Sequence, residues 1–191
     1  MGSIAEPIAI ASHVPYPTNP LFSLAGRTIA ITGAGRGLGI TLAAAVLEAG
    51  GHVACIDILS APSELEWASL QAIAKSSNLT VTYHRCDIIL EDEVAATLDL
   101  IADTGSKIGA PLMGTIACAG IQQKIPAVEY PVDGFRRMMD VNVTGTFLTI
   151  KHSARVFMKE GTKGSVVMIA SMSGQVANRV SLGKLDNIRT F

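Results

Sequence analysis

The chain has 191 residues, of which 49% are hydrophobic and 16% are charged, and its formal net charge is −1. This length predicts one domain with a buried core, and the scattered charges of both signs argue against a nucleic-acid partner. No apolar run reaches the roughly 18 residues that a membrane-spanning helix needs, so we expect no membrane partner. The apolar excess instead indicates parallel strands that are covered on both faces.

The N-terminal segment, residues 1–21, holds four of the eight prolines and shows no periodicity. It lacks the charged and apolar regions of a secretory signal. We therefore expect a flexible leader over 1–21 and a cytoplasmic location.

Three cysteines, Cys55, Cys86 and Cys118, fall near the ends of apolar runs. Their spacing fits no zinc pattern, and an odd number argues against a disulfide framework. We expect them to be small apolar core residues, and we expect no metal site.

Short apolar runs alternate with helical patterns from Arg27 onward. In chain order, we expect a strand over 29–32, a helix over 40–49, a strand over 52–56, a helix over 64–76, a strand over 79–86, a helix over 91–101, a strand over 112–118, a helix over 133–159 and a strand over 165–170. Such alternation produces βαβ units with right-handed crossovers. The sequence therefore predicts an α/β fold, a Rossmann-type doubly wound parallel sheet of about five strands that lacks the sixth strand and the elements after it.

A glycine-rich loop joins the first expected strand to the first expected helix. Thr32, Gly33, Gly37 and Gly39 fit the spacing T-G-x-x-x-G-x-G. Glycine allows the sharp turn and lets a pyrophosphate approach the backbone at the helix N-terminus. A turn without a ligand is the alternative, but an acidic residue, Asp57, ends the second expected strand. This combination favours dinucleotide binding.

The spacing of these glycines resembles the signature of the short-chain dehydrogenase/reductase family, and the resemblance runs from about Leu24 to about Val180. It implies a dinucleotide-binding Rossmann domain over 22–180, followed by a tail over 181–191 that does not resemble the family. It also implies that Leu38 contributes to the cofactor site together with the threonine and the glycines of the motif.

The choice between NAD and NADP depends on two residues. Asp57 lies where an acidic group accepts hydrogen bonds from the adenosine ribose hydroxyls, and its charge would repel a 2′-phosphate. The resemblance implies that Arg36 could meet such a phosphate, whereas the alternative for Arg36 is a solvated loop side chain. We favour NAD on the strength of Asp57 and leave NADP open.

Two segments after later strands also resemble the family. Asp87 resembles its adenine-contacting Asp, and a strand-end helix cap is the alternative. Where similar proteins have Asn-Asn-Ala-Gly, this chain has Ala-Cys-Ala-Gly at 117–120. Ala119 and Gly120 therefore still imply a close approach of the backbone to the cofactor. The amide that ties neighbouring strands is absent, which puts local stability in doubt.

The expected catalytic residues are Asn142 and Ser171. Asn142 begins an Asn-x-x-Gly motif, to which the resemblance assigns a water-holding role in a proton relay. The alternative is a helix-interior Asn that bonds its neighbours. Ser171 begins a Ser-x-x-Gly motif, and its hydroxyl would bond a substrate oxygen. Ser173 is the competing serine, and it could instead serve a turn or a cap.

The family's acid/base is a Tyr followed four residues later by a Lys, both beyond the serine. The three tyrosines of this chain, Tyr16, Tyr83 and Tyr130, all precede Ser171, and no Tyr-x-x-x-Lys occurs. We therefore expect a C-terminally truncated chain that is inactive alone. The helix that forms the family's homo-oligomer interface follows the serine loop, so assembly is also in doubt.

The resemblance implies NAD(P)-dependent interconversion of a ketone or aldehyde and an alcohol, with a small molecule such as a polyol, a ketose or a secondary metabolite as substrate. The alternative function is that of an NAD(P)-binding pseudoenzyme or a regulatory partner of a complete relative.

Overall fold

The computed structural model describes residues 20–172, so the expected tail, Ser173 and most of the expected leader lie outside the described residues. In chain order, the elements are η1 (Pro20–Phe22), β1 (Thr28–Thr32), α1 (Gly37–Glu48), β2 (His52–Asp57), α2 (Glu64–Ser76), β3 (Val81–Arg85), α3 (Glu91–Lys107), β4 (Leu112–Ala117), η2 (Ala127–Glu129), α4 (Val132–Met139), η3 (Asp140–Gly145), α5 (Thr146–Glu160) and β5 (Ser165–Met168).

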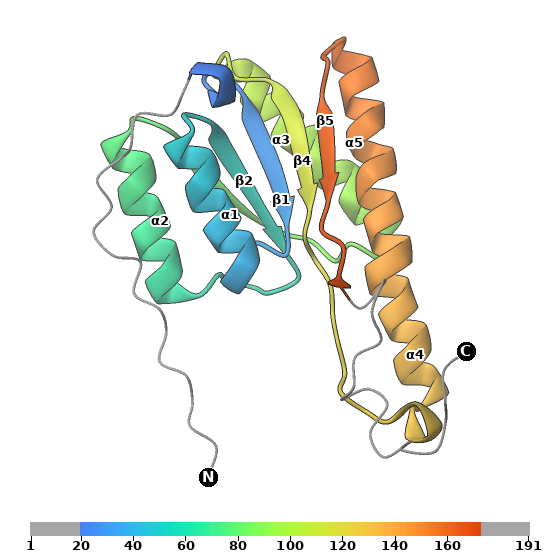
Figure 1. Ribbon diagram of the computed structural model, residues 1–191. Helices are drawn as coiled ribbons and strands as arrows, with labels where there is room; N and C mark the ends of the chain where they lie inside the picture. Colours follow the sequence, from blue (N-terminus) through green and yellow to red (C-terminus); the bar gives the residue numbers. More distant parts are fainter. Residues whose placement is uncertain (1–19, 173–191) are drawn as a thin grey trace.

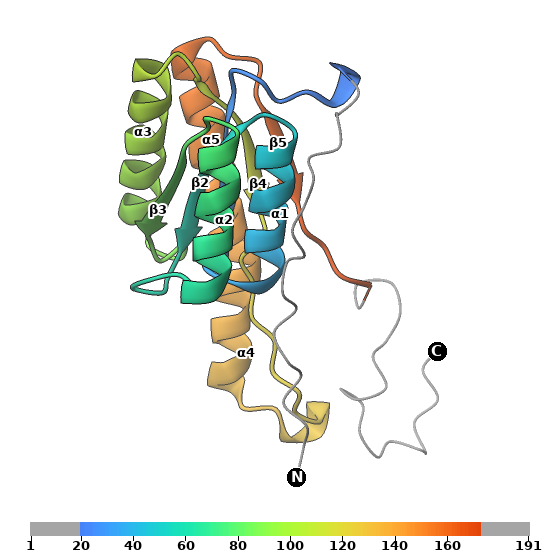
Figure 2. The same cartoon turned by 90° about the vertical axis from the view of Figure 1, so that its left-hand side faces the viewer.

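The five strands form one parallel sheet in the order β3-β2-β1-β4-β5. Helices α1 and α2 cover one face, and α3 and α5 cover the other (Figures 1 and 2). This arrangement confirms the predicted doubly wound α/β fold. The strand order reverses between β1 and β4, and ligands of such sheets bind outside the carboxyl ends of the strands at this point.

The central strand explains the high apolar content. All five residues of β1 are buried because helices cover both of its faces. Ile31 packs with Leu47 and Leu70 on the side of α1 and α2. Ala30 packs with Leu98 and Val156 on the side of α3 and α5. Among the described residues, no helix is long and apolar enough to cross a membrane.

Helix α3 continues six residues past the end expected from the sequence, to Lys107. From the sequence, a helix is expected only over 91–101. Ala102 and Gly105 are buried and extend the helical spacing of the buried face beyond Ile101. A β-carbon on Gly105 would lie 2.6 Å from Ala110 O, so the missing side chain permits this close approach.

The expected helix over 133–159 is not regular. It consists of α4, a π-helical segment η3 and α5, which together form one rod that extends beyond the carboxyl edge of the sheet (Figure 1). A π-turn inserts extra backbone into the hydrogen-bond ladder and is often found at functional sites. Here it contains Asn142.

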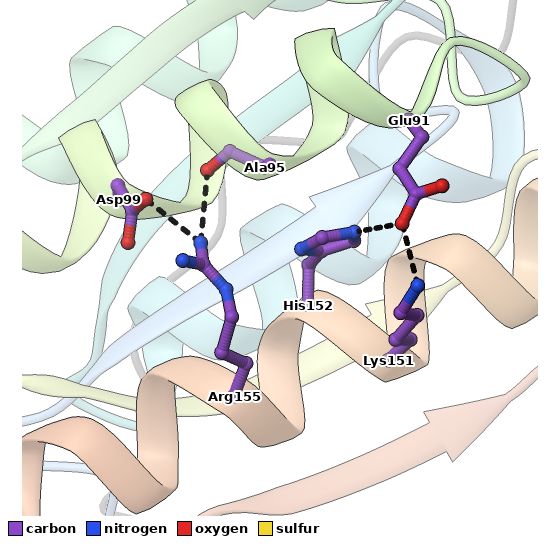
Figure 3. A network of polar contacts seen from close by, with 6 residues as sticks. All are labelled: Glu91, Ala95, Asp99, Lys151, His152 and Arg155. Atoms are coloured by element: carbon purple, nitrogen blue, oxygen red, sulfur yellow. Dashed lines mark hydrogen bonds and ion pairs between the residues drawn. The ribbon is translucent and has the colours of Figure 1, made fainter.

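Ion pairs join α5, the last part of this rod, to α3 (Figure 3). Glu91 Oε1 lies 2.6 Å from Lys151 Nζ and 3.1 Å from His152 Nε2. Arg155 Nη2 lies 2.7 Å from Asp99 Oδ2. The hydrogen bond from Lys151, followed by the bond with His152, lowers the pKa of Glu91. The helix that carries these contacts, α5, directly follows η3 in the rod.

Candidate functional site

The glycine loop after β1 leaves no room for side chains at two positions. Gly33 has a φ of +71°, and a β-carbon on it would lie 2.7 Å from Ala119 Cα. A β-carbon on Gly39 would overlap Gly33 O and would lie 2.7 Å from Gly33 C. The loop therefore packs backbone against backbone, both within itself and against the segment that follows β4.

Thr32 links the ends of β1 and β4. Its side chain is buried, with 2% exposure. Its hydroxyl oxygen accepts hydrogen bonds from the backbone N–H groups of Cys118 and Ala119, each at 3.2 Å. Thr32 thus provides a tie between neighbouring strands in a chain without the Asn of the family motif.

Thr32→Val should remove this tie without changing the shape of the side chain much. Two backbone N–H groups would lose their acceptor, so we expect the free energy of unfolding to fall by about 2 kcal/mol. Thr32→Ser keeps the hydroxyl and loses one methyl group, so its loss should be about 1 kcal/mol. Urea unfolding of the two variants checks this, and equal stability of the two would contradict the bridging role.

Asp57 organises the loop from the end of β2. Its Oδ2 accepts a hydrogen bond from Gly35 N at 2.8 Å, and its Oδ1 accepts one from Leu59 N at 3.1 Å. A β-carbon on Gly35 would lie 2.9 Å from Asp57 Cγ. Each carboxylate oxygen has a further lone pair, so the side chain can still accept hydrogen bonds from a ribose.

Asp87 does not cap a helix, so that alternative from the sequence is wrong. The N-cap of α3 is Leu90. Asp87 Oδ1 instead accepts a hydrogen bond from Ile89 N at 3.2 Å, in a local turn of the kind that Asp favours. Its own N–H donates to Glu93 Oε2 at 2.9 Å. The turn holds Asp87 at the carboxyl edge of the sheet.

One pocket of about 570 Å³, a volume typical of small-molecule sites, lies beside the glycine loop, and Thr32 and Gly35 are not among the residues that line it. From the expected cofactor set it contains Gly33, Arg36, Gly37, Leu38, Gly39, Asp57, Asp87, Ala119 and Gly120. Sequence reasoning missed other residues that line it, namely Ile58, Leu59, Glu66, Ile88, Ile121, Arg137 and Val141, and it expected Cys86 and Cys118 only as core residues. Some of the missed residues directly follow a predicted site residue, and that adjacency could have indicated them. Glu66 and Arg137 lie on helices and belong to no motif.

A second pocket of about 640 Å³ shares residues 118–121 with the first. It contains both expected catalytic residues, Asn142 and Ser171, together with Tyr130 and Met138. The structure therefore brings the two expected catalytic residues to one cavity that adjoins the expected cofactor pocket.

The Asn142 side chain lines the second pocket and is bonded to Ile121, a residue that lines both pockets. Its Oδ1 accepts a hydrogen bond from Ile121 N at 2.8 Å, and its Nδ2 donates one to Ile121 O at 2.9 Å. The alternative that Asn142 bonds its helical neighbours is wrong, because Ile121 lies in the loop after β4. The water-holding role stays a prediction.

The cysteines occupy different surroundings. Burial raises the pKa of the Cys55 thiol to about 12 and also raises the pKa of Cys86 and Cys118. Cys55 and Cys86 are buried as expected, whereas Cys118 is half-buried and lines both pockets. In the part of the chain that the structure describes, no His, Cys, Asp and Glu side chains group as a metal site.

Comparison with known proteins agrees with this geometry. Residues 27–182 match the family model described as short chain dehydrogenase. A short chain dehydrogenases/reductase notP' from Aspergillus versicolor is 41% identical over 159 residues, which are 83% of this chain and 53% of that protein. A 2,5-dichloro-2,5-cyclohexadiene-1,4-diol dehydrogenase from Sphingobium indicum is 38% identical over 154 residues, which are 80% of this chain and 57% of that protein. The chain thus spans about half the length of these curated relatives.

Solved structures give the same result. A short-chain type dehydrogenase/reductase from Mycobacterium marinum is 33% identical with a TM-score of 0.69, and the match covers 83% of this chain and 61% of that one. Similar structures include a short chain dehydrogenase bound to NAD and an NADPH-dependent reductase. Proteins of this fold therefore use either cofactor.

Proposed function

This chain belongs to the short-chain dehydrogenase family, and from that premise we propose that it binds NAD(H) in the pocket beside the glycine loop. The observation that carries the proposal is the exclusion of side chains at Gly33 and Gly39. These two glycines let the loop pack tightly on its own backbone and on the segment after β4. Gly37, which also lines the pocket, has a φ of +59° and nothing within 4 Å of the place where a β-carbon would stand, so a diphosphate could approach the backbone there.

The residues around the pocket fit such a dinucleotide. The first turn of α1 has backbone N–H groups without partners inside the helix, and those of Leu38 and Gly39 would bind the diphosphate. Asp57 would accept hydrogen bonds from the adenosine ribose, and Asp87 would lie beside the adenine. Ala119 and Gly120 would pass close to the nicotinamide end, where the two pockets meet.

When bound, the nicotinamide supplies or accepts a hydride. The substrate would occupy the second pocket, with the Ser171 hydroxyl bonded to its carbonyl or alcohol oxygen. Asn142 holds the loop after β4 through Ile121 and so positions the boundary between the cofactor and the substrate. The proposed reaction is the interconversion of a ketone or aldehyde and an alcohol. Since one relative is named for a cyclic diol, we propose a polyol or a related hydroxylated molecule as the substrate class.

The proton of that alcohol needs an acid/base. No Tyr-x-x-x-Lys occurs among the 191 residues. We therefore propose that these residues bind the cofactor and that turnover requires a Tyr and a Lys from additional polypeptide. A second proposed function is that of a regulatory NAD(P)-binding partner of a complete relative, which could cover the exposed residues Val167 and Met168 of β5.

The test measures binding and turnover separately. NADH titration of the 191-residue chain should give a dissociation constant between about 1 μM and 1 mM, the usual range for enzyme substrates. NADH oxidation with ketoses and cyclic ketones should be undetectable with this chain and measurable with a longer form that contains Tyr-x-x-x-Lys. The absence of NADH binding at millimolar concentration would refute the proposal. Binding with no turnover in any longer form would favour the regulatory function.

Cys118 provides a chemical probe of the same pocket. Because Cys55 and Cys86 are buried and Cys118 is half-buried, a small maleimide should react first with Cys118 in the folded protein. Saturating NADH should slow this reaction by about tenfold or more, since it would occupy 90% or more of the sites. Peptide mass mapping identifies the modified cysteine, and equal rates with and without NADH would place the cofactor elsewhere.

A further inference from the structure

The start of α2 packs directly on the glycine loop. Ser63 N donates a hydrogen bond to Gly35 O at 2.8 Å. Gly37 N donates one to Glu66 Oε1 at 3.2 Å. Glu66 lies in the first turn of α2, is half-buried and lines the proposed cofactor pocket. No sequence motif includes this residue.

Two carboxylates therefore lie on either side of Arg36. Asp57 accepts the N–H of Gly35, and Glu66 accepts the N–H of Gly37. Arg36 is exposed, and its guanidinium has no ion pair within residues 20–172. Within the loop, the one cation that could attract an additional phosphate is thus outnumbered by the two carboxylates bonded to its neighbours. Arg137, the other cation that lines the pocket, lies on α4 and not in this loop.

We infer that Glu66 is a specificity-determining residue that disfavours a 2′-phosphate on the bound dinucleotide. The inference rests on the proposed function and deepens it. Consecutive Cα atoms are 3.8 Å apart, so the two loop residues that bind the carboxylates are separated by less than about 8 Å. That is about one Debye length at physiological salt, so a phosphate held beside Asp57 would also feel the charge of Glu66. The adenosine ribose of NAD(H) carries no 2′-phosphate, so the charge of Glu66 would repel it little.

One substitution at Glu66 can remove its negative charge and keep its hydrogen bond. Glu66→Gln keeps a carbonyl oxygen that can accept the Gly37 N–H, and it removes only the negative charge. The loop should therefore keep its shape in this variant. Glu64 is a matched control, because it lies in the same first turn of α2 but is exposed and does not line the pocket.

The experiment titrates NADH and NADPH into the 191-residue chain and into its Glu66→Gln and Glu64→Gln variants, at low and at physiological salt. For Glu66→Gln we expect NADPH to bind about three- to tenfold more tightly, with NADH within about twofold of the original value. Glu64→Gln should leave the ratio of the two affinities unchanged. The gain for NADPH should be smaller at the higher salt concentration. Urea unfolding confirms that both variants are folded.

The outcomes are distinguishable. An unchanged NADPH-to-NADH ratio in folded Glu66→Gln, with NADH still bound, would overturn the role of Glu66 and leave the proposed function intact. An equal change in Glu64→Gln would also overturn it, because the effect would then be one of net charge. Failure of the original chain to bind either cofactor would overturn the proposed function and this inference with it.

Discussion

Gly39→Ala is expected to abolish measurable NADH binding and to lower the free energy of unfolding by about 3 kcal/mol. The added β-carbon would overlap Gly33 O and would lie 2.7 Å from Gly33 C and 2.8 Å from Ala34 Cα. These are backbone atoms, so no side-chain rotation can relieve the overlap. Helix α1 would have to move away from the loop that would hold the diphosphate. NADH titration and urea unfolding measure the two effects.

Gly109→Ala is the matched control for this prediction. Gly109 has a φ of +73°, but a β-carbon there would meet nothing within 4 Å. The substitution should therefore cost about 1 kcal/mol through the left-handed backbone conformation alone, with NADH binding unchanged. If Gly39→Ala bound NADH as well as Gly109→Ala does, the close packing of the loop would not be required for the cofactor.

The order of the elements could be predicted because each strand and helix is encoded locally. The uninterrupted apolar residues of β1 indicate a strand with both faces covered, and the spacing of Trp67 and Leu70 indicates a helix. The end of α3 could not be predicted in this way. Gly105 has a low helix propensity, but it lies inside the helix, where the absence of a side chain lets the chain at Ala110 come close.

The residues of the candidate site could be predicted where the backbone conformation or close packing allows only one residue type. Glycines at positions where no β-carbon fits occur at a recognisable spacing in the sequence. Asp57 ends a strand at the distance from them that dinucleotide-binding folds have. The π-turn at Asn142 and the contact of Glu66 with Gly37 leave no such pattern. The side chains of Asn142 and Glu66 each bond a loop that is distant in the sequence, Asn142 at Ile121 and Glu66 at Gly37, and such contacts appear only in the fold.

Thr32 and Asn142 show why a motif does not define a role. Both belong to sequence motifs of the family, and both have side chains that hold the loop after β4, at Cys118 and Ala119 in one case and at Ile121 in the other. The contacts that these two side chains make in the structure hold the backbone of this loop in place. Any catalytic contribution would follow from the position that they give to this loop between the two pockets.

Asp57→Asn is expected to weaken NADH binding by about 10- to 100-fold and to shift the preference toward NADPH. Hydrogen bonds to a charged acceptor contribute about 1.5–3 kcal/mol, and the substitution removes that charge from the proposed ribose site. The amide has only one acceptor oxygen, whereas the carboxylate accepts N–H groups from Gly35 and Leu59 on separate oxygens. One of these N–H groups would face the new NH₂ group, so we also expect a loss of about 1–3 kcal/mol in unfolding free energy.

Asp87→Asn is the control that separates the predicted change in cofactor binding for Asp57→Asn from the effect of losing any negative charge at the edge of the sheet. Asp87 lies at the carboxyl edge of the sheet next to Asp57, but only its Oδ1 accepts a backbone N–H, from Ile89. An amide oxygen can take over that single hydrogen bond, so stability should change by less than about 0.5 kcal/mol. Titrations of NADH and NADPH with both variants complete the comparison. A change of less than about threefold in NADH affinity for Asp57→Asn would place the adenosine ribose away from this carboxylate, because losing even one charged hydrogen bond costs more than that.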